Sequence, residues 1–429
     1  MKPGQWSQTR LGTPATVEAR RDSNLAWSAF AIGSTLYTAF SITPAVRGES
    51  SAEVFDTVHR LAGELARWHP PLQLVTQTVF VREAADREFC EAVFGAFPRH
   101  PQALTHVVLQ PPADGARVAV EAWAVGGPQV RVQRESPWRV EVRQEGLRWI
   151  HVAGLYARLP GAPLMAQAQE LFDRCGWQLR EAGANWRSVV RMWWQVPDIL
   201  GPNGSGRRYA ELNRAREEAF RQILRPPVVD GAADGPAAPP PLSEFLYPAS
   251  TGIGAEPGGT LALASVALTG LSGKGALLGL ENPLQMPAYC YPPHLAAPPP
   301  MFSRAVALRL PEGLWIWISG TASIVGAEVE HPDDPTAQTE QTLDNIAALL
   351  SGENFARHGW PGVEAGLEDL VSARVYVKRP QDVPACRAVC ERRLAKCPKL
   401  YLIADICRPA LRVEIEGVAF VGPHRARAG

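Results

Sequence analysis

One carboxylate in the sequence stands where it could take part in chemistry. Residues 314–323, LWIWISGTAS, have the composition of a buried strand that ends in a small polar turn, and Glu328 follows a few residues later. A carboxyl group held at the end of a strand can donate or accept a proton when its surroundings set its pKa suitably. Glu328 is therefore a candidate catalytic residue.

Motifs for metal ions and nucleotides are absent from the sequence. The nine histidines contain no H-x-x-x-H pair, and Cys386, Cys390 and Cys397 lack a second cluster that would complete four ligands. GLSGKG at 270–275 is not a full phosphate-binding loop, and GIGAEPGG at 252–259 has the wrong glycine interval for a dinucleotide turn. We expect no metal ion and no cofactor.

Composition excludes further classes of protein. The chain has 429 residues, 46% of them hydrophobic, and its 43 basic and 43 acidic side chains cancel. Zero net charge favours neither nucleic acid nor an anionic membrane. No apolar run resembles a signal peptide or a membrane span, and seven scattered cysteines fit a reducing compartment. These features predict a cytoplasmic globular protein.

A repeated pattern of elements surrounds the candidate carboxylate. Three segments with Trp27, Trp149 and Trp315 each read as a strand that ends at a small-residue turn. An amphipathic helix, a β-branched strand, a second helix and an apolar strand follow each of them. The order β-β-α-β-α-β, three times over, predicts an α/β (α+β) fold of mixed sheets packed on helices. The predicted units are residues 1–130, 131–280 and 281–429.

Two proline-rich insertions lengthen the second repeat. Residues 225–241 read as a surface loop. Residues 281–305 are also too proline-rich for a regular element, but they carry Tyr289, Tyr291 and Arg304. That mixture of aromatic and charged side chains predicts a binding loop.

Several strings of residues resemble two related families. QTEQTLDNIAALL, ARVYVK and CRPALRVEIEGVAF in the third unit resemble the Rid (YjgF-like) family, which forms homotrimers with ligand clefts between subunits. VVRMWWQVPDI, RYAELNRAREEAF, YPASTGIGAE, NPLQMPAY, MFSRA and SGTASIVGAE, in this order, resemble the chorismatases over about residues 145–421. The resemblance implies three Rid-like units in one chain, a pseudo-trimer, and hence a monomer.

The resemblance also implies an activity and a set of site residues. Chorismatases cleave the enolpyruvyl ether of chorismate, which carries two carboxylates, and arginine binds carboxylates bidentately. Glu328 matches the glutamate that protonates the enolpyruvyl group in the family, provided that burial raises its pKa. The implied substrate-binding residues are Arg304, Arg408, Arg216, Arg191, Tyr209, Tyr289, Thr321 and Ser323.

Only one of the three clefts between units is expected to be active. Rid-like proteins place their carboxylate-binding arginine at the position of Arg408, and the matching stretches QPPADGA and STGIGAEPGG contain no arginine. The active cleft is therefore predicted between the second and third units.

Other interpretations of these residues stay open. Glu328 lies near Glu330 and other acidic side chains and could be a solvated loop carboxylate, and the tyrosines could be core aromatics. Cys407 has no motif partner that would make it a nucleophile. The competing functions are a Rid-type imine deaminase and a non-catalytic binding module.

The sequence departs from the chorismatase pattern at three places. Many members have Gly-His-Glu where this chain has Gly326, Ala327 and Glu328, and the usual Asn-x-Gly-Arg is Asn213 to Arg216 with Ala215 in place of glycine. The loop HLAAPPP also differs from its relatives. The product is thus open between 3-hydroxybenzoate, which is favoured, 4-hydroxybenzoate and a dihydroxycyclohexadiene carboxylate.

Overall fold

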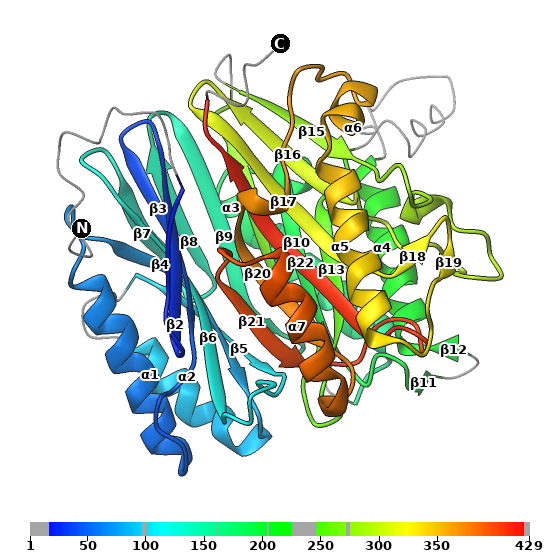
Figure 1. Ribbon diagram of the computed structural model, residues 1–429, viewed down its shortest axis with the longest axis horizontal. Helices are drawn as coiled ribbons and strands as arrows, with labels where there is room; N and C mark the ends of the chain where they lie inside the picture. The colour runs from blue at the N-terminus through cyan, green and yellow to red at the C-terminus, as the bar shows by residue number, and fades with distance from the viewer. Residues whose placement is uncertain are drawn as a thin grey trace, which may run out of the picture.

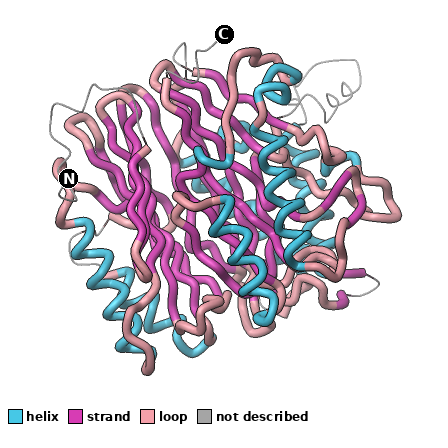
Figure 2. The backbone as a smooth tube through the Cα atoms, viewed as in Figure 1, coloured by secondary structure: helices cyan, strands magenta, loops and turns pink. Residues whose placement is uncertain are grey.

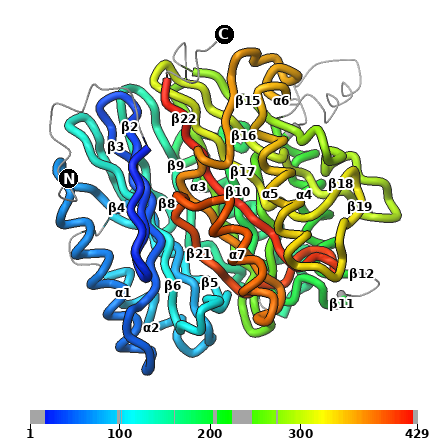
Figure 3. Tube along the Cα trace, in the orientation of Figure 1, coloured from blue at the N-terminus to red at the C-terminus, as the bar shows by residue number. Residues whose placement is uncertain are grey.

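Three six-stranded mixed sheets make up the computed structural model of the chain (Figure 1). The structure describes residues 17–423 except 97–99, 101, 160, 204–205, 225–245 and 272–274. The predicted surface loop at 225–241 lies outside the described residues. Figure 3 shows that the three sheets follow one another along the chain, from the blue N-terminal part to the red C-terminal part.

The first sheet has the strand order β1-β2-β3-β6-β4-β5, with two helices packed on one face. β4 and β5 are parallel, and the other neighbours are antiparallel. Its elements are β1 (Glu18–Arg21), β2 (Leu25–Ile32), β3 (Thr35–Ile42), α1 (Ser50–Leu65), β4 (Gln73–Val81), α2 (Arg87–Gly95), β5 (Leu104–Leu109) and β6 (Val118–Gly126).

The second sheet has the equivalent order β13-β10-β14-β9-β8-β7. A two-stranded ribbon is inserted before its second helix. Its elements are β7 (Arg131–Ser136), β8 (Arg139–Gln144), β9 (Leu147–Tyr156), α3 (Leu164–Glu181), β10 (Val189–Pro197), β11 (Pro202–Asn203), β12 (Gly206–Arg207), α4 (Arg208–Leu224), β13 (Ala249–Ala255) and β14 (Ala262–Thr269).

The third sheet has the order β15-β16-β17-β22-β20-β21. It begins at Ala276, slightly before the boundary at 281 that the sequence suggested. Its elements are β15 (Ala276–Leu280), β16 (Ala305–Leu310), β17 (Gly313–Ala322), β18 (Ile324–Val325), β19 (Glu328–Val329), α5 (Pro335–Leu350), α6 (Gly352–Arg357), β20 (Leu370–Val377), α7 (Val383–Arg393), β21 (Lys399–Ile403) and β22 (Val413–Val421).

The predicted fold class is confirmed, but each unit contains two more strands than expected. An extra edge strand (β1, β7 or β15) opens each sheet, and a strand parallel to its neighbour (β5, β13 or β21) precedes the last one. Several of these strands are short or polar, such as EARR and RVQRES, or rich in small residues, such as ASTGIGA. Such segments carry little apolar alternation, so the sequence pattern missed them.

The repeat is also displaced by one strand in the first unit. Trp27 lies on β2, whereas Trp149 and Trp315 lie on β9 and β17, which match β3 in strand order. The true equivalent of these two tryptophans is Tyr37. Its ring centroid is 6.0 Å from that of Trp149 and 5.0 Å from that of Trp315, and the two tryptophans are 5.1 Å apart. The three equivalent aromatic side chains therefore meet at the centre of the pseudo-trimer.

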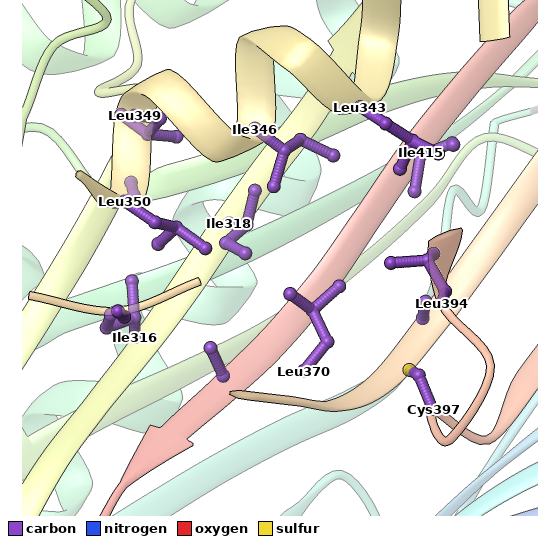
Figure 4. Close-up of a cluster of buried hydrophobic side chains, with 14 of the residues drawn as sticks. Ile316, Ile318, Leu343, Ile346, Leu349, Leu350, Leu370, Leu394, Cys397 and Ile415 are labelled. Carbon is purple, nitrogen blue, oxygen red and sulfur yellow. The ribbon is translucent and has the colours of Figure 1, made fainter. Parts of the chain in front are cut away.

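Each sheet lies between its helices and this central core. Figure 2 shows the strands gathered in the middle of the molecule with helices toward the outside. On the outer face of the third sheet, α5 turns its apolar stripe inward, and Leu343, Ile346 and Leu349 pack on Ile316 and Ile415 (Figure 4). Pro335 at the start of α5 and the Asp334 side chain, which accepts from the backbone N–H of Ala337, fix where this helix begins.

Candidate active site

A large cavity opens between the second and third units. Its volume is about 1020 Å³. It is lined by α4 and β13 from the second unit, and by the loop before β16, the end of β17, the β18–β19 ribbon and the start of β22 from the third. The proline-rich loop at 281–305 supplies one wall through residues 291–304, as expected of a binding loop.

Arg304 is a buried arginine of the cavity wall that keeps a free donor. Its side chain is only 3% exposed, and its Nη2 donates to the carbonyl of Met286 at 2.8 Å and to the hydroxyl of Tyr291 at 2.7 Å. Its Nε has no hydrogen-bond partner among the described residues. These contacts hold the guanidinium group rigidly and leave an N–H available for an anion.

Arg408 reaches the same place from the loop before β22. Its Nη1 donates to the carbonyl of Ala327 at 2.6 Å, and its guanidinium lies 4.9 Å from the ring centroid of Tyr291. Its Nη2 is buried without a partner in the described part of the chain. Tyr291 thus contacts both arginines, and the cavity offers two rigid cations to an anionic ligand.

Glu328 lies on β19 at the rim of the cavity. It lines the cavity together with Arg304 and Arg408, but its side chain is exposed. The sequence-based argument required burial to keep this carboxyl protonated, and the structure does not provide it. The reason is local: Glu328 belongs to a two-stranded ribbon, paired with Val325, that projects from the sheet rather than packing within it.

A buried carboxyl group, Glu414, faces the same cavity from β22. It is 5% exposed, and burial raises its pKa to about 8. The charge of Glu416 acts in the same direction, whereas Arg191 and Arg304 oppose it. Glu414 therefore carries its proton at neutral pH and can donate it.

A glycine makes room for this carboxyl group. A methyl group placed on Gly320 would lie 2.1 Å from Glu414 Oε1. Gly320 belongs to a bulge of β17, where the pairing with β22 shifts between Ile318 and Thr321. A side chain at position 320 would therefore force the carboxyl group to move.

Only the third unit has this acid. The pairing of β22, β6 and β14 with β20, β4 and β10 places Ala119 and Ala262 at the positions that match Glu414. Two of the three equivalent clefts therefore lack a proton donor at this position.

Arg191 and Arg216 lie behind the cavity wall. Arg191 Nη2 donates to Glu416 and, at 2.6 Å, to Thr251, so it forms part of a buried ion network rather than lining the cavity. Arg216 Nη2 donates at 3.1 Å to Ser250, which does line the cavity. Neither guanidinium group lines the cavity, so direct contact of these two arginines with a substrate stays a prediction.

The other predicted substrate-binding residues also divide into one that lines the cavity and three that do not. Tyr209 lines the cavity. Tyr289 packs in the second unit with its ring 5.4 Å from that of Tyr247, and it does not line the cavity. The hydroxyl groups of Thr321 and Ser323 are buried and donate to the carbonyls of Ser319 and Glu330, at 3.0 and 2.9 Å, so they hold the β17 turn and do not face the cavity.

Cys407 lies in the cavity wall beside Arg408. Burial raises the pKa of its thiol to about 12, so the sulfur is protonated near neutral pH. This agrees with the absence of a nucleophile motif.

Among the described residues, no group of three or more His, Cys, Asp or Glu side chains is placed to hold a metal ion. The same part of the chain holds no helix with the length and apolar character needed to cross a membrane.

Sequence reasoning missed Glu414, although its signal is present. In RVEIEGVAF, two glutamates alternate with other residues inside a strand that the sequence predicts to be apolar. Buried carboxylates are rare unless they are paired or functional, so this alternation could have identified the acid.

The known proteins found to be similar to this chain are named chorismatase or 3-hydroxybenzoate synthase. A chorismatase from Streptomyces rapamycinicus is 32% identical over 304 residues, which are 70% of this chain and 81% of that protein. A 3-hydroxybenzoate synthase from Streptomyces hygroscopicus is 37% identical over 237 residues, which are 54% of this chain and 63% of that protein. The match thus spans less than two thirds of the length of the second relative. No protein-family model matches the chain.

A solved structure supports the same likeness at the level of the fold. A crystal structure of a chorismatase superposes on 81% of this chain and 93% of its own with a TM-score of 0.61 and 28% identity.

Proposed function

Since the chain belongs to the chorismatase family and has its Rid/YjgF-like fold, we propose that it cleaves the enolpyruvyl ether of chorismate in the cavity between its second and third units. One observation carries the proposal: a buried carboxyl group, Glu414, shares a cavity with two rigid arginines that have unused donors.

The two arginines suit the two ends of the substrate. Chorismate carries one carboxylate on its ring and one on the enolpyruvyl group, and each needs a cation in a neutral protein. Arg304 and Arg408 meet this need from separate loops, and both keep an N–H free in the described structure. Tyr209, Asn213 and Ser250 line the opposite wall and provide polar groups for the ring hydroxyl.

The proposed reaction begins with proton transfer from Glu414 to the terminal methylene carbon of the enolpyruvyl group. The methylene becomes the methyl group of pyruvate, and the adjacent carbon becomes an oxocarbenium ion. The Glu414 carboxylate formed in this step faces the cation. Water attacks the oxocarbenium carbon, and the Glu414 carboxylate takes up the proton that this water loses. The bond between that carbon and the ether oxygen then breaks: the hemiketal hydroxyl becomes the carbonyl of pyruvate and its proton goes to the ether oxygen, which stays on the ring as a hydroxyl of the dihydroxycyclohexadiene carboxylate. Elimination of water from this diene gives a hydroxybenzoate.

The name of one relative supports 3-hydroxybenzoate as the product. Burial raises the pKa of the Cys407 thiol to about 12, so this side chain is not a thiolate in the free protein, and the proposed reaction does not use it as a nucleophile. The preference for 3-hydroxybenzoate over the other products rests on the likeness to the 3-hydroxybenzoate synthase.

Glu328 is the second candidate for the proton donor. It lines the same cavity, but a donor must hold its proton before the substrate arrives, and burial is the usual means. Glu414 has that burial and Glu328 does not.

Paired amide variants test the proposal. We expect Glu414→Gln to lower pyruvate release from chorismate by at least about two orders of magnitude, the usual scale for removing a general acid. Glu328→Gln is the matched control, and we expect it to retain most of the activity. Release is measured by coupling pyruvate to lactate dehydrogenase, and the aromatic product is identified by chromatography.

Each outcome of this experiment is informative. Loss of activity in Glu328→Gln, with activity retained in Glu414→Gln, would identify Glu328 as the proton donor. A wild-type protein that releases no pyruvate, but deaminates 2-aminoacrylate generated in the assay, would be a Rid-type imine deaminase. A protein with neither activity that still binds chorismate would be a binding module.

A further inference from the structure

A second buried carboxylate, Glu416, lies directly behind the proposed acid. It is two residues from Glu414 on β22 and therefore on the same face of the strand. It is 3% exposed, and its two oxygens accept five hydrogen bonds. The donors are Arg191 and Thr251 to Oε2, and Arg374 at 3.1 Å, Trp193 at 3.1 Å and Tyr376 at 2.9 Å to Oε1.

These partners keep Glu416 ionised. Burial alone would raise its pKa, but Arg191, Arg374 and the hydrogen bonds outweigh burial and lower it. Arg374 is shared with Glu121 of the first unit, which it contacts at 3.0 Å. Two arginines and two glutamates therefore form a buried, neutral network across all three units.

Thr251 connects this network to the cavity. Its hydroxyl donates to Glu416 and accepts from Arg191 at 2.6 Å and from the backbone N–H of Gly320 at 3.0 Å. Gly320 is the residue whose bare Cα leaves room for the Glu414 carboxyl group. The position of the acid and the fixed charge behind it are thus linked through one side chain.

The charged and titratable groups around Glu414 come from every neighbouring element. Glu416 is on its own strand, and Arg191 is on β10. The remaining groups are Arg304 before β16, Cys407 and Arg408 in the loop before β22, and Tyr209 on α4. Among these groups, Glu416 is the one whose charge favours the protonated form of Glu414.

We propose that Glu416, fixed by Arg191 and Thr251, is a positioning residue that keeps Glu414 protonated and directed at the substrate. This inference rests on the proposed role of Glu414 as the proton donor. A purely structural role for the network is the competing explanation, because any broken buried ion pair can destabilise a protein.

Two matched variants separate the two explanations. Glu416→Gln removes the charge beside Glu414, and Glu121→Gln removes the other buried carboxylate of the same network, which pairs with Arg374 on the side of the first unit. The first measurement is the titration of Glu414 by ¹³C NMR of labelled glutamate in the substrate-free protein, assigned by its loss in Glu414→Gln. The second is the pH dependence of kcat/KM for pyruvate release.

We expect the wild-type rate to fall as pH rises through about 8, the pKa of Glu414. In Glu416→Gln, both the NMR titration and this fall in rate should move to lower pH by about one unit or more, while Glu121→Gln leaves them in place. Equal movement in both variants, or none, would overturn the inference. If the wild type releases no pyruvate, the proposed function fails while the NMR titration still decides the role of Glu416.

A milder variant covers the case in which Glu416→Gln does not fold. Thr251→Val removes the hydroxyl link but no charge. We expect it to lower kcat about tenfold with little change in KM, and Thr251→Ser to restore kcat. Unchanged kcat in Thr251→Val, or failure of Thr251→Ser to recover it, would contradict the inference.

Discussion

Glu414 combines the properties that a carbon-protonating acid needs. Its carboxyl group is buried, it lies beside a fixed negative charge, and it opens on a cavity with Arg304 and Arg408. The same environment that prepares it for proton transfer must cost stability when the group ionises. Catalytic preparation and folding stability are therefore coupled at this residue.

This coupling predicts a pH-dependent effect on stability. The pKa of Glu414 is about 8 in the folded protein and about 4.5 for the ordinary group, so between these values the unfolded chain binds fewer protons. Its contribution to the free energy of unfolding is therefore complete below about pH 4.5 and is lost as pH rises to about 8. Glu414→Gln does not ionise, so we expect it to gain on the order of a few kcal/mol relative to the wild type between pH 5 and pH 9.

Thermal unfolding at several pH values measures this difference. Glu353→Gln, at an exposed position, is the control and should follow the wild type at every pH. A difference between Glu414→Gln and the wild type that does not change with pH would show that Glu414 titrates normally.

At the scale of elements, a β-bulge and its glycine create the space for the acid. Bulges often lie next to active sites, where they redirect backbone and side chains. Here the bulge of β17 places Gly320 against Glu414, and Thr251 on β13 receives its backbone N–H. Two strands from different units thus shape the position of one carboxyl group.

The glycine can be tested without changing any charged residue. We expect Gly320→Ala to displace the Glu414 carboxyl group, because the new methyl group would lie 2.1 Å from Oε1, and to lower kcat by at least about tenfold. Gly258→Ala is the control, since a methyl group there meets nothing within 4 Å. Pyruvate release and melting temperature are measured together. A folded Gly320→Ala protein with normal kcat would contradict the proposed position of the acid.

At the scale of the whole molecule, the clefts between the three similar units differ in volume and in lining residues. The cleft between the first and second units that matches the cavity between the second and third units has a volume of only about 30 Å³, compared with about 1020 Å³. Arg87 lies 3.9 Å above the ring of Tyr156 and fills part of it. Ala262 stands there in place of the acid.

This difference between the clefts predicts that each chain binds one molecule of substrate. Isothermal titration calorimetry of Glu414→Gln with chorismate, in which turnover is blocked, should give a stoichiometry of about one. A value near two or three would mean that the clefts without an acid or a matching arginine still bind chorismate, and that Arg304 and Arg408 do not define the binding site.

The class of fold and the three-fold repetition could be predicted from the sequence alone, and Arg304 and Arg408 could be named as candidate site residues. Apolar periodicity is a local property, so helices such as α5 and strands such as β17 and β22 could be read from it. Arg304 and Arg408 were predicted from the likeness of short strings, and the structure places both in one cavity.

The burial of one carboxyl group and the exposure of the other follow from the packing of distant segments. Glu328 and Glu414 both follow or occupy apolar strands, but one lies in a projecting ribbon and the other between packed sheets. Burial, and with it the protonation state, depends on what other segments cover a side chain, and the groups around Glu414 come from residues 191–416 of the sequence. The same holds for Arg191, whose partner Glu416 is 225 residues away. The alternation in RVEIEGVAF marks its glutamates as candidates, but the contacts that bury and pair them come from distant segments and cannot be read from that string.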